Sequence, residues 1–262
     1  MGFLEVYALG GLTCFLLMTA LWLVSLRLKN ASIVDIFWGA GFVLCNWVYL
    51  ALTPDGTPER KWLAAVLVTV WGLRLSGYIL WRNAGKAEDF RYRKWREENG
   101  AAWWWKSYLR VFLLQGLLMW LISAPLLANQ IGRKPGLIWL DYVAVAVWAI
   151  GFFFEAVGDL QMARFRANSA NKGKVLDHGV WHYTRHPNYF GDSTQWWGYY
   201  LLALAAGGWW TLWAPLMMTG LLLRVSGVTL LERSLKETKP GYKEYVESTS
   251  AFIPWFPKKR HT

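Results

Sequence analysis

The stretch VYALGGLTCFLLMTALWLVSL at residues 6–26 decides the class of fold, because it runs for 21 residues without a charged side chain. A helix needs about 20 mostly apolar residues to cross the hydrocarbon core of a bilayer. The alternation of apolar and polar residues that a membrane β-barrel requires does not persist along the chain. Residues 6–26 are therefore predicted to form a membrane-spanning helix.

Further apolar segments follow at residues 33–52, 62–81, 108–128, 137–158, 194–206 and 209–228. Only Gly207 and Gly208 separate the last two, which form either a tight helical hairpin or one kinked segment. The 20 Trp among 262 residues suit a membrane protein, which places Trp at both interfaces. With no long linker, the chain is predicted to be a single all-α domain, residues 1–262, a multi-pass bundle of about seven transmembrane helices.

The distribution of basic residues predicts the orientation of these helices. With the N-terminus outside, 23 of the 28 Lys and Arg residues fall on the cytoplasmic side. Arg74 lies within a span, and the four on the opposite side are Arg60, Lys61, Arg133 and Lys134. The positive-inside rule therefore places the C-terminus in the cytoplasm.

The net charge of +11 does not indicate a nucleic-acid partner, since the basic residues flank apolar spans where topology and anionic lipid account for them. Patterns typical of zinc fingers, RRM domains and helix-turn-helix motifs are missing from the sequence. So are G-x-G-x-x-G, the P-loop pattern and the G-x-S-x-G elbow. Any nucleotide must then be held by helix ends and side chains. We infer membrane lipid as a partner and no obligatory protein partner.

Asp35 and Arg74 lie inside predicted spans, where a charged side chain costs a few kcal/mol and marks a candidate functional site. Asp35, in SIVDIFWG, either complements the helix dipole or serves as a proton donor, since an apolar environment favours its protonated form. Arg74, in WGLRLSGY, forms either a structural ion pair or a fork for a bound phosphate.

A third candidate cluster closes the fifth span. Glu155 and Asp159 are four residues apart and share a helix face, and Arg166 follows seven residues after Asp159. This set is either a salt-bridge network or the binding site of a polar ligand that enters from the cytosol.

The stretch HGVWHYTRHPNYFGD, from His178 to Asp192, is the most specific of the candidate binding motifs in the sequence. Pro187 favours a helix that begins directly after His186 and carries Asn188 and Asp192 on one face. Arg185, Asn188 and the free N–H groups of that helix would bind an anion. The spacing of four between His178, His182 and His186 resembles a metal face, but Gly179 and Pro187 break the helix, so no metal is expected.

These motifs resemble a known family. The runs RHPNYFGD, EAVGDLQMARFR, GLRLSGYILWRNAGKAEDFRY and LLERSLKETKPGYKEYVESTSAFIPWFP are similar to the bacterial branch of the steroid 5α-reductase-like membrane family. The resemblance implies seven transmembrane helices, NADPH on the cytoplasmic side, and reduction of the C=C bond of an apolar enone such as a 3-oxo-Δ4 steroid. It also implies a bacterial inner (cytoplasmic) membrane as the location.

The resemblance carries the family's cofactor pattern onto particular residues. Lys174 replaces an Arg and Asp192 a Glu, so charge is kept at both. The predicted cofactor-binding residues are Arg74, Asn83, Lys86, Asp159, Arg166, Lys174, Arg185, Asn188, Asp192 and Arg224.

The substrate end departs further from the family. Asp35 stands for the acid that polarises the ketone and is the predicted catalytic residue, with Trp38 and Trp71 expected to bind substrate. The family Tyr falls on Trp71, which cannot donate in the same way. A family His and Tyr become Val228 and Glu232. The resemblance therefore implies the cofactor more firmly than the steroid.

Two other classes fit parts of the sequence. Isoprenylcysteine-type methyltransferases also carry RHPxYxG and a C-terminal Glu-plus-Tyr tail, and bind S-adenosylmethionine. The cations Arg166 and Lys174 favour NADPH, because S-adenosylmethionine has no phosphate. A transporter or assembly factor is the third class, but transport would predict paired repeats, which the sequence does not show.

Overall fold

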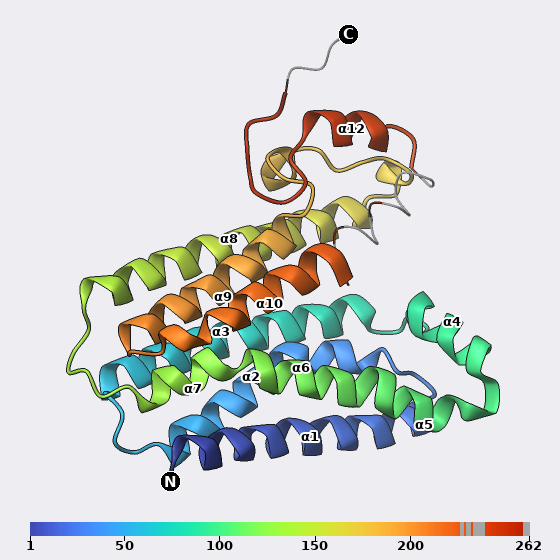
Figure 1. Cartoon of the computed structure of the whole chain (residues 1–262). Coiled ribbons are helices and arrows are strands. Elements are labelled where there is room, and N and C mark those ends of the chain that lie inside the picture. Colours follow the sequence, from blue (N-terminus) through green and yellow to red (C-terminus); the bar gives the residue numbers. More distant parts are fainter. Residues whose placement is uncertain (226–227, 229–231, 233–238, 259–262) are drawn as a thin grey trace. The chain divides into compact units, whose positions relative to one another are not determined.

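The computed structural model describes residues 1–225, 228, 232 and 239–258, where every regular element is a helix. The long helices are α1 (Phe3–Leu28), α2 (Ile33–Leu52), α3 (Pro58–Asn83), α8 (Trp139–Ala167) and α9 (Pro187–Ala205) (Figure 1). The shorter ones are α4 (Phe90–Asn99), α5 (Trp103–Ser107), α6 (Leu114–Ile122), α7 (Ala124–Ile131), α10 (Trp213–Gly220) and α12 (Tyr242–Ser248). Single-turn and π-helical pieces are η1 (Gly100–Ala102), η2 (Tyr108–Leu113), η3 (Ser169–Asn171), η4 (Gly179–His182), η5 (Trp209–Leu212) and η6 (Leu221–Val225).

Several stretches of the described chain are long and apolar enough to cross a bilayer. They are Phe3–Leu28, Ile33–Leu52, Pro58–Asn83, Phe90–Ile131 and Trp139–Ala167. Each overlaps one of the first five predicted segments, so the all-helical, multi-pass membrane class is confirmed. The count of seven spans and the orientation of the termini stay predictions.

The last two apolar segments form a helical hairpin and not one kinked helix. α9 ends at Ala205, and Gly207 turns the chain with a φ of 95°, which glycine adopts without a Cβ clash. α10 follows from Trp213, and its Thr219 hydroxyl lies 2.8 Å from the Ser193 hydroxyl of α9. The side-by-side course of α9 and α10 is visible in Figure 1.

The chain divides into two compact units. The first comprises Met1–Ile138 and Leu202–Thr211, and the second Trp139–Leu201 and Leu212–Thr262. The predicted site residues up to Lys86 belong to the first unit, and those from Asp159 onward to the second.

In the first unit, α2 packs against both α1 and α3. α2 and α3 cross at Gly39 and Gly72, where a Cβ on Gly39 would lie 2.4 Å from the Gly72 carbonyl oxygen. Trp71 is fully buried beside this crossing, its ring centroid 5.9 Å from that of Phe42, and Trp38 meets Phe42 edge-on at 5.4 Å. Small residues let the two helices touch, and the aromatic rings beside them fill the core.

In the second unit, α8 and α9 cross through glycines. A Cβ on Gly191 of α9 would lie 2.4 Å from the Gly151 carbonyl oxygen of α8. Two helical turns further along α9, a Cβ on Gly198 would lie 2.9 Å from Cβ of Trp148 on α8. Larger residues at Gly191 or Gly151 would force the helices apart, so these positions set the register in which α8 and α9 present their polar side chains.

Candidate functional site

The carboxylate of Asp35, in the first turn of α2, is the centre of a polar cluster in the first unit. Its Oδ1 accepts a 2.7 Å hydrogen bond from the hydroxyl of Tyr92, and its Oδ2 accepts one of 3.2 Å from Nη2 of Arg91. Gln115 donates to the same Tyr92 oxygen at 3.3 Å. Tyr92 is buried, and its hydroxyl lies between two protein partners, Asp35 and Gln115.

The connection between α3 and α4 holds this cluster in place. The Ala31 N–H donates to Oε1 of Glu88 at 2.7 Å, and the Asp89 N–H donates to the Ser32 hydroxyl at 2.7 Å. Arg96 binds both oxygens of Glu88, at 2.8 and 2.9 Å. These bonds tie α4 to the start of α2 and so bring Tyr92 to Asp35.

Asp89 caps α4 and shares Arg91 with Asp35. Its Oδ1 accepts from the Arg91 backbone N–H at 3.0 Å and from Nε of Arg91 at 2.9 Å. Burial raises the pKa of Asp89, but the hydrogen bonds and charge of Arg91 outweigh it, and the pKa lies below its ordinary value. The guanidinium of Arg91 is therefore held between the carboxylates of Asp89 and Asp35, which fixes its position.

The other predicted cofactor residues of this unit lie along and after α3. The guanidinium of Arg74 lies 5.5 Å from the ring centroid of Tyr78, a cation–π distance. Asn83 accepts a 3.3 Å hydrogen bond from Nε of Arg82, and Lys86 is exposed. None of these contacts tests a cofactor role, which stays a prediction for all three residues.

In the second unit, the crossing of α8 and α9 brings two predicted cofactor residues together. Nδ2 of Asn188 lies 3.5 Å from Oδ1 of Asp159, which is buried. Gly158 lies against the start of α9, where a Cβ would be 3.0 Å from Cγ of Pro187. Asp192 follows one turn after Asn188 and is also buried. The predicted helix start at Pro187 is confirmed, and it sets Asn188 against α8.

The acid one turn before Asp159 has a structural partner. Glu155 is buried, and its Oε2 accepts a 2.6 Å hydrogen bond from Nε2 of Gln195 on α9. The carboxylate of Glu155 thus helps to hold α8 against α9. The predicted cations of this unit that lie outside the helix crossing, Arg166, Lys174 and Arg224, are exposed and can meet a water-soluble anion.

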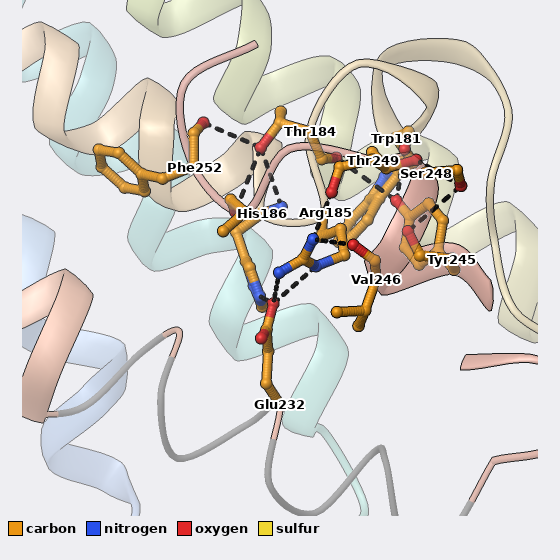
Figure 2. Close-up of polar contacts among 11 residues, drawn as sticks. Trp181, Thr184, Arg185, His186, Glu232, Tyr245, Val246, Ser248, Thr249 and Phe252 are labelled. Carbon is orange, nitrogen blue, oxygen red and sulfur yellow. Dashed lines mark hydrogen bonds and ion pairs between the residues drawn. The ribbon is translucent and has the colours of Figure 1, made fainter. Parts of the chain in front are cut away.

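Arg185 joins the start of α9 to the C-terminal tail, by which we mean residues 239–258 (Figure 2). Its Nε and Nη2 donate to Oε1 of Glu232 at 2.7 and 2.6 Å. Nη1 donates to the carbonyl oxygens of Val246, at 3.0 Å, and Thr249. The side chain is 7% exposed. The guanidinium therefore clasps the tail, and its predicted contact with a cofactor stays a prediction.

Neighbouring bonds complete this docking of the tail. The Tyr245 hydroxyl donates to the Trp181 carbonyl oxygen, and the Thr184 hydroxyl donates to the Phe252 carbonyl oxygen at 2.9 Å. A cavity of about 310 Å³ lies beside them, and its lining residues are Asp177, His182, Ser248, Thr249, Pro257 and Lys258. The tail is thus one wall of a polar hollow at this end of the unit.

The carboxylate of Glu232 is shared between two residues. Besides Arg185, Nε2 of His186 lies 3.3 Å from its Oε1. Burial raises the pKa of Glu232, but the hydrogen bonds from His186 and Arg185 outweigh it and hold the pKa below its ordinary value. The Glu232 carboxyl is therefore ionised at neutral pH.

The three evenly spaced histidines do not converge. His178 is mostly exposed, Nδ1 of His182 lies 3.3 Å from the Asp177 carbonyl oxygen, and His186 faces Glu232. Within the part of the chain that the structure describes, no three His, Cys, Asp or Glu side chains gather to hold a metal ion.

An apolar cavity of about 330 Å³ lies between α1 and the segment formed by η2 and α6. Its lining includes Gly11, Met18, Tyr108, Gly116 and Trp120. None of the predicted site residues lines this cavity. We therefore place the candidate catalytic and cofactor-binding groups in the polar clusters.

Sequence reasoning missed the residues that surround Asp35. Tyr92 and Arg91 lie in the GLRLSGYILWRNAGKAEDFRY run, where the available signal was a Tyr within a charged stretch directly after an apolar span. Gln115 gave no signal. In the second unit, the sequence indicated Arg185 but not its partner Glu232, which lies 47 residues later.

Comparison with known proteins gives two findings. A family model described as "Protein of unknown function (DUF1295)" matches residues 21–249. An uncharacterized protein of Schizosaccharomyces pombe, C594.04c, is 26% identical over 276 residues, which cover 95% of this chain and 79% of the relative. No solved structure matches. The family match begins within α1, reaches the end of α12 and includes every candidate residue.

Proposed function

Because the chain belongs to the DUF1295 family, the steroid 5α-reductase-like group, we propose that it reduces the C=C bond of an apolar enone with NADPH. A 3-oxo-Δ4 steroid, reduced at the 5α position, is the substrate we expect. When bound, the dinucleotide would supply a hydride to the β-carbon of the enone, and a proton from water would complete the reduction at the α-carbon. The location we propose is a bacterial inner membrane with the tail in the cytoplasm.

The contact between Asp35 and Tyr92 is the observation that carries this proposal. Reduction of an enone builds negative charge on its carbonyl oxygen, and a fixed donor at that oxygen lowers the barrier. An acid and a phenol 2.7 Å apart, beside apolar helices, supply such a donor. Methyl transfer from a sulfonium has no need of a donor for a carbonyl oxygen.

The hydrogen bonds around Tyr92 allow one donor to be directed at a substrate. A phenol oxygen accepts two hydrogen bonds and donates one. Gln115 already donates to it, and a protonated Asp35 donates as well by reversing the 2.7 Å bond. The Tyr92 proton is then free to point at a carbonyl oxygen. Asp35 and Tyr92 thus act together, which supplies the hydroxyl that Trp71 lacks.

The second unit offers groups that suit the dinucleotide. Asp159 and Asn188 provide a carboxylate and an amide for hydroxyl and amide groups, and the exposed cations Arg166, Lys174 and Arg224 suit phosphates. Arg185, whose guanidinium is clasped by Glu232 and tail carbonyls, acts in this proposal by positioning the start of α9, next to Asn188. NADPH remains the cofactor we propose.

Cofactor binding to the detergent-solubilised protein tests the proposal. We expect NADPH to bind, S-adenosylmethionine not to bind, and a 3-oxo-Δ4 steroid to oxidise the bound NADPH with loss of nicotinamide absorbance. Asp35→Ala should lower turnover about 100-fold, because it removes the group that directs the Tyr92 proton at the substrate oxygen, with NADPH affinity kept. Binding of S-adenosylmethionine instead of NADPH would establish the methyltransferase alternative.

A further inference from the structure

We propose that Lys239 completes an anion site with Arg166 and the Lys174 loop, and that this site binds the 2′-phosphate of NADPH. The proposal rests on the proposed function, because it names the residue that would select NADPH over NADH. Lys239 is the first residue of the C-terminal tail and was not among the predicted site residues.

The docked tail fixes where Lys239 lies. The Tyr242 N–H donates to the Lys239 carbonyl oxygen at 3.3 Å, which joins Lys239 to the first turn of α12. α12 is anchored in turn by buried Tyr242 and Tyr245 and by the clasp of Arg185 on the Val246 carbonyl oxygen. Lys239 is therefore held at the edge of an anchored element.

A chain of hydrogen bonds through the loop after α8 connects Lys239 to the end of that helix. Nζ of Lys239 donates to the Lys174 carbonyl oxygen at 2.8 Å. The Lys174 N–H donates to the Asn171 carbonyl oxygen at 3.0 Å, and Nδ2 of Asn171 donates to the Phe165 carbonyl oxygen at 3.0 Å. Phe165 is the residue before Arg166, so the loop folds back on the helix end that carries Arg166. Lys239, Lys174 and Arg166 thus belong to one group.

The charges in this group repel one another. Burial lowers the pKa of Lys239, and the nearby positive charge of Arg166 lowers it further. Holding like charges together costs free energy, and a bound anion offsets that cost because it attracts each of the positive groups. A phosphomonoester suits such a site, because it presents several strong acceptor oxygens to a guanidinium fork and an ammonium.

Two sources supply a phosphomonoester: the 2′-phosphate of NADPH and the headgroup of phosphatidate in the bilayer. We assign the nucleotide, because Lys239 is joined to the loop that follows α8, the helix that carries Asp159 and Arg166. NADH lacks the 2′-phosphate and is otherwise the same molecule, so it is the matched ligand for the test.

The test uses Lys239→Gln in the full-length protein, with Lys243→Gln as its control. Lys243 is exposed and lies on the same tail in α12. Dissociation constants of NADPH and NADH are measured by nicotinamide fluorescence in phosphatidate-free nanodiscs and repeated with phosphatidate. We expect Lys239→Gln to weaken NADPH binding about 10-fold, as for loss of one charged hydrogen bond, and to leave NADH unchanged. Lys239→Arg should restore NADPH binding, and Lys243→Gln should have no effect.

The outcomes separate this inference from the proposed function. If the wild-type protein binds NADPH and Lys239→Gln leaves the ratio of NADPH to NADH affinity unchanged, only the inference fails. If Lys239→Gln changes competition by phosphatidate alone, the site belongs to lipid and the inference fails as well. If the wild-type protein binds neither dinucleotide, both proposals fail.

Discussion

The Tyr92 hydroxyl lies 2.7 Å from the Asp35 carboxylate, although 57 positions separate the two residues in the chain. The hydrogen bonds of Glu88 and Asp89 to the start of α2 create this contact. An ionisable side chain on an apolar helix is costly, and here a phenol and a guanidinium offset the cost. The Asp35–Tyr92 pair is therefore held by neighbouring side chains, and it supplies the donor that we propose for the substrate oxygen.

Tyr92→Phe is expected to lower kcat for enone reduction about 100-fold and to leave NADPH affinity unchanged. The ring keeps its edge contact with Trp95, at 5.8 Å, so the change removes only the hydroxyl. Steady-state kinetics and cofactor titration measure the two effects. Tyr108→Phe, which removes a hydroxyl bonded to Thr19, is the control. Equal kcat in Tyr92→Phe and wild type would remove Tyr92 from the mechanism.

Arg166→Ala should weaken NADPH binding about 10-fold or more, because a charged hydrogen bond is worth roughly 1.5–3 kcal/mol. The control is Arg164→Ala, which removes an exposed cation two residues earlier on α8. Fluorescence titration with NADPH gives both constants. An Arg166→Ala protein that binds NADPH as tightly as Arg164→Ala would show that Arg166 does not hold the cofactor.

Arg185→Gln should release the tail. The change leaves the carboxylate of Glu232, 13% exposed, without its ionic partner, which costs about 3–5 kcal/mol when such a pair is broken. Chymotrypsin should then cleave near Tyr242 and Tyr245 much faster than in the wild type. Arg164→Gln is the control and should be cleaved at the wild-type rate. Wild-type protection in Arg185→Gln would show that the other bonds hold the tail.

The clasp should also depend on pH with a predictable sign. The folded-state pKa of Glu232 lies below the ordinary value of 4.5. Its stabilisation is therefore complete above about pH 5 and is lost as the pH falls through the lowered pKa. Hydrogen exchange in α12, corrected for the intrinsic pH dependence, should show a drop in protection below pH 4.5. Glu232→Gln should be less protected and lack this step, and an identical step in that variant would assign it to another group.

Gly191→Ala should destabilise the second unit by about 1–3 kcal/mol, the usual cost of an overpacked contact. The new Cβ would lie 2.4 Å from the Gly151 carbonyl oxygen, so α8 and α9 must separate. Gly220→Ala is the matched control, since nothing lies within 4 Å of the added Cβ. Thermal unfolding in detergent compares the two. Equal melting temperatures would show that the crossing tolerates a methyl group.

The sequence by itself determined the membrane class, the extent of most helices and the start of α9 at Pro187. Each of these depends on neighbours along the chain: an apolar run long enough for a bilayer, or a proline that fixes its own φ and that of the residue before it. It also marked Asp159 and Asn188 as candidates, and the glycines of α8 and α9 then brought them within 3.5 Å.

Only the tertiary structure decided which partners the polar groups have. Nothing near Asp35 in the chain predicts Tyr92, and nothing near Arg185 predicts Glu232, because each contact is made by segments that meet only after the helices pack. A local pattern fixes where a side chain lies on its helix, but not what another helix or the tail brings to it. Lys239 is the same case: a lysine like many others in the sequence, distinguished by the Lys174 carbonyl oxygen that it contacts in the fold.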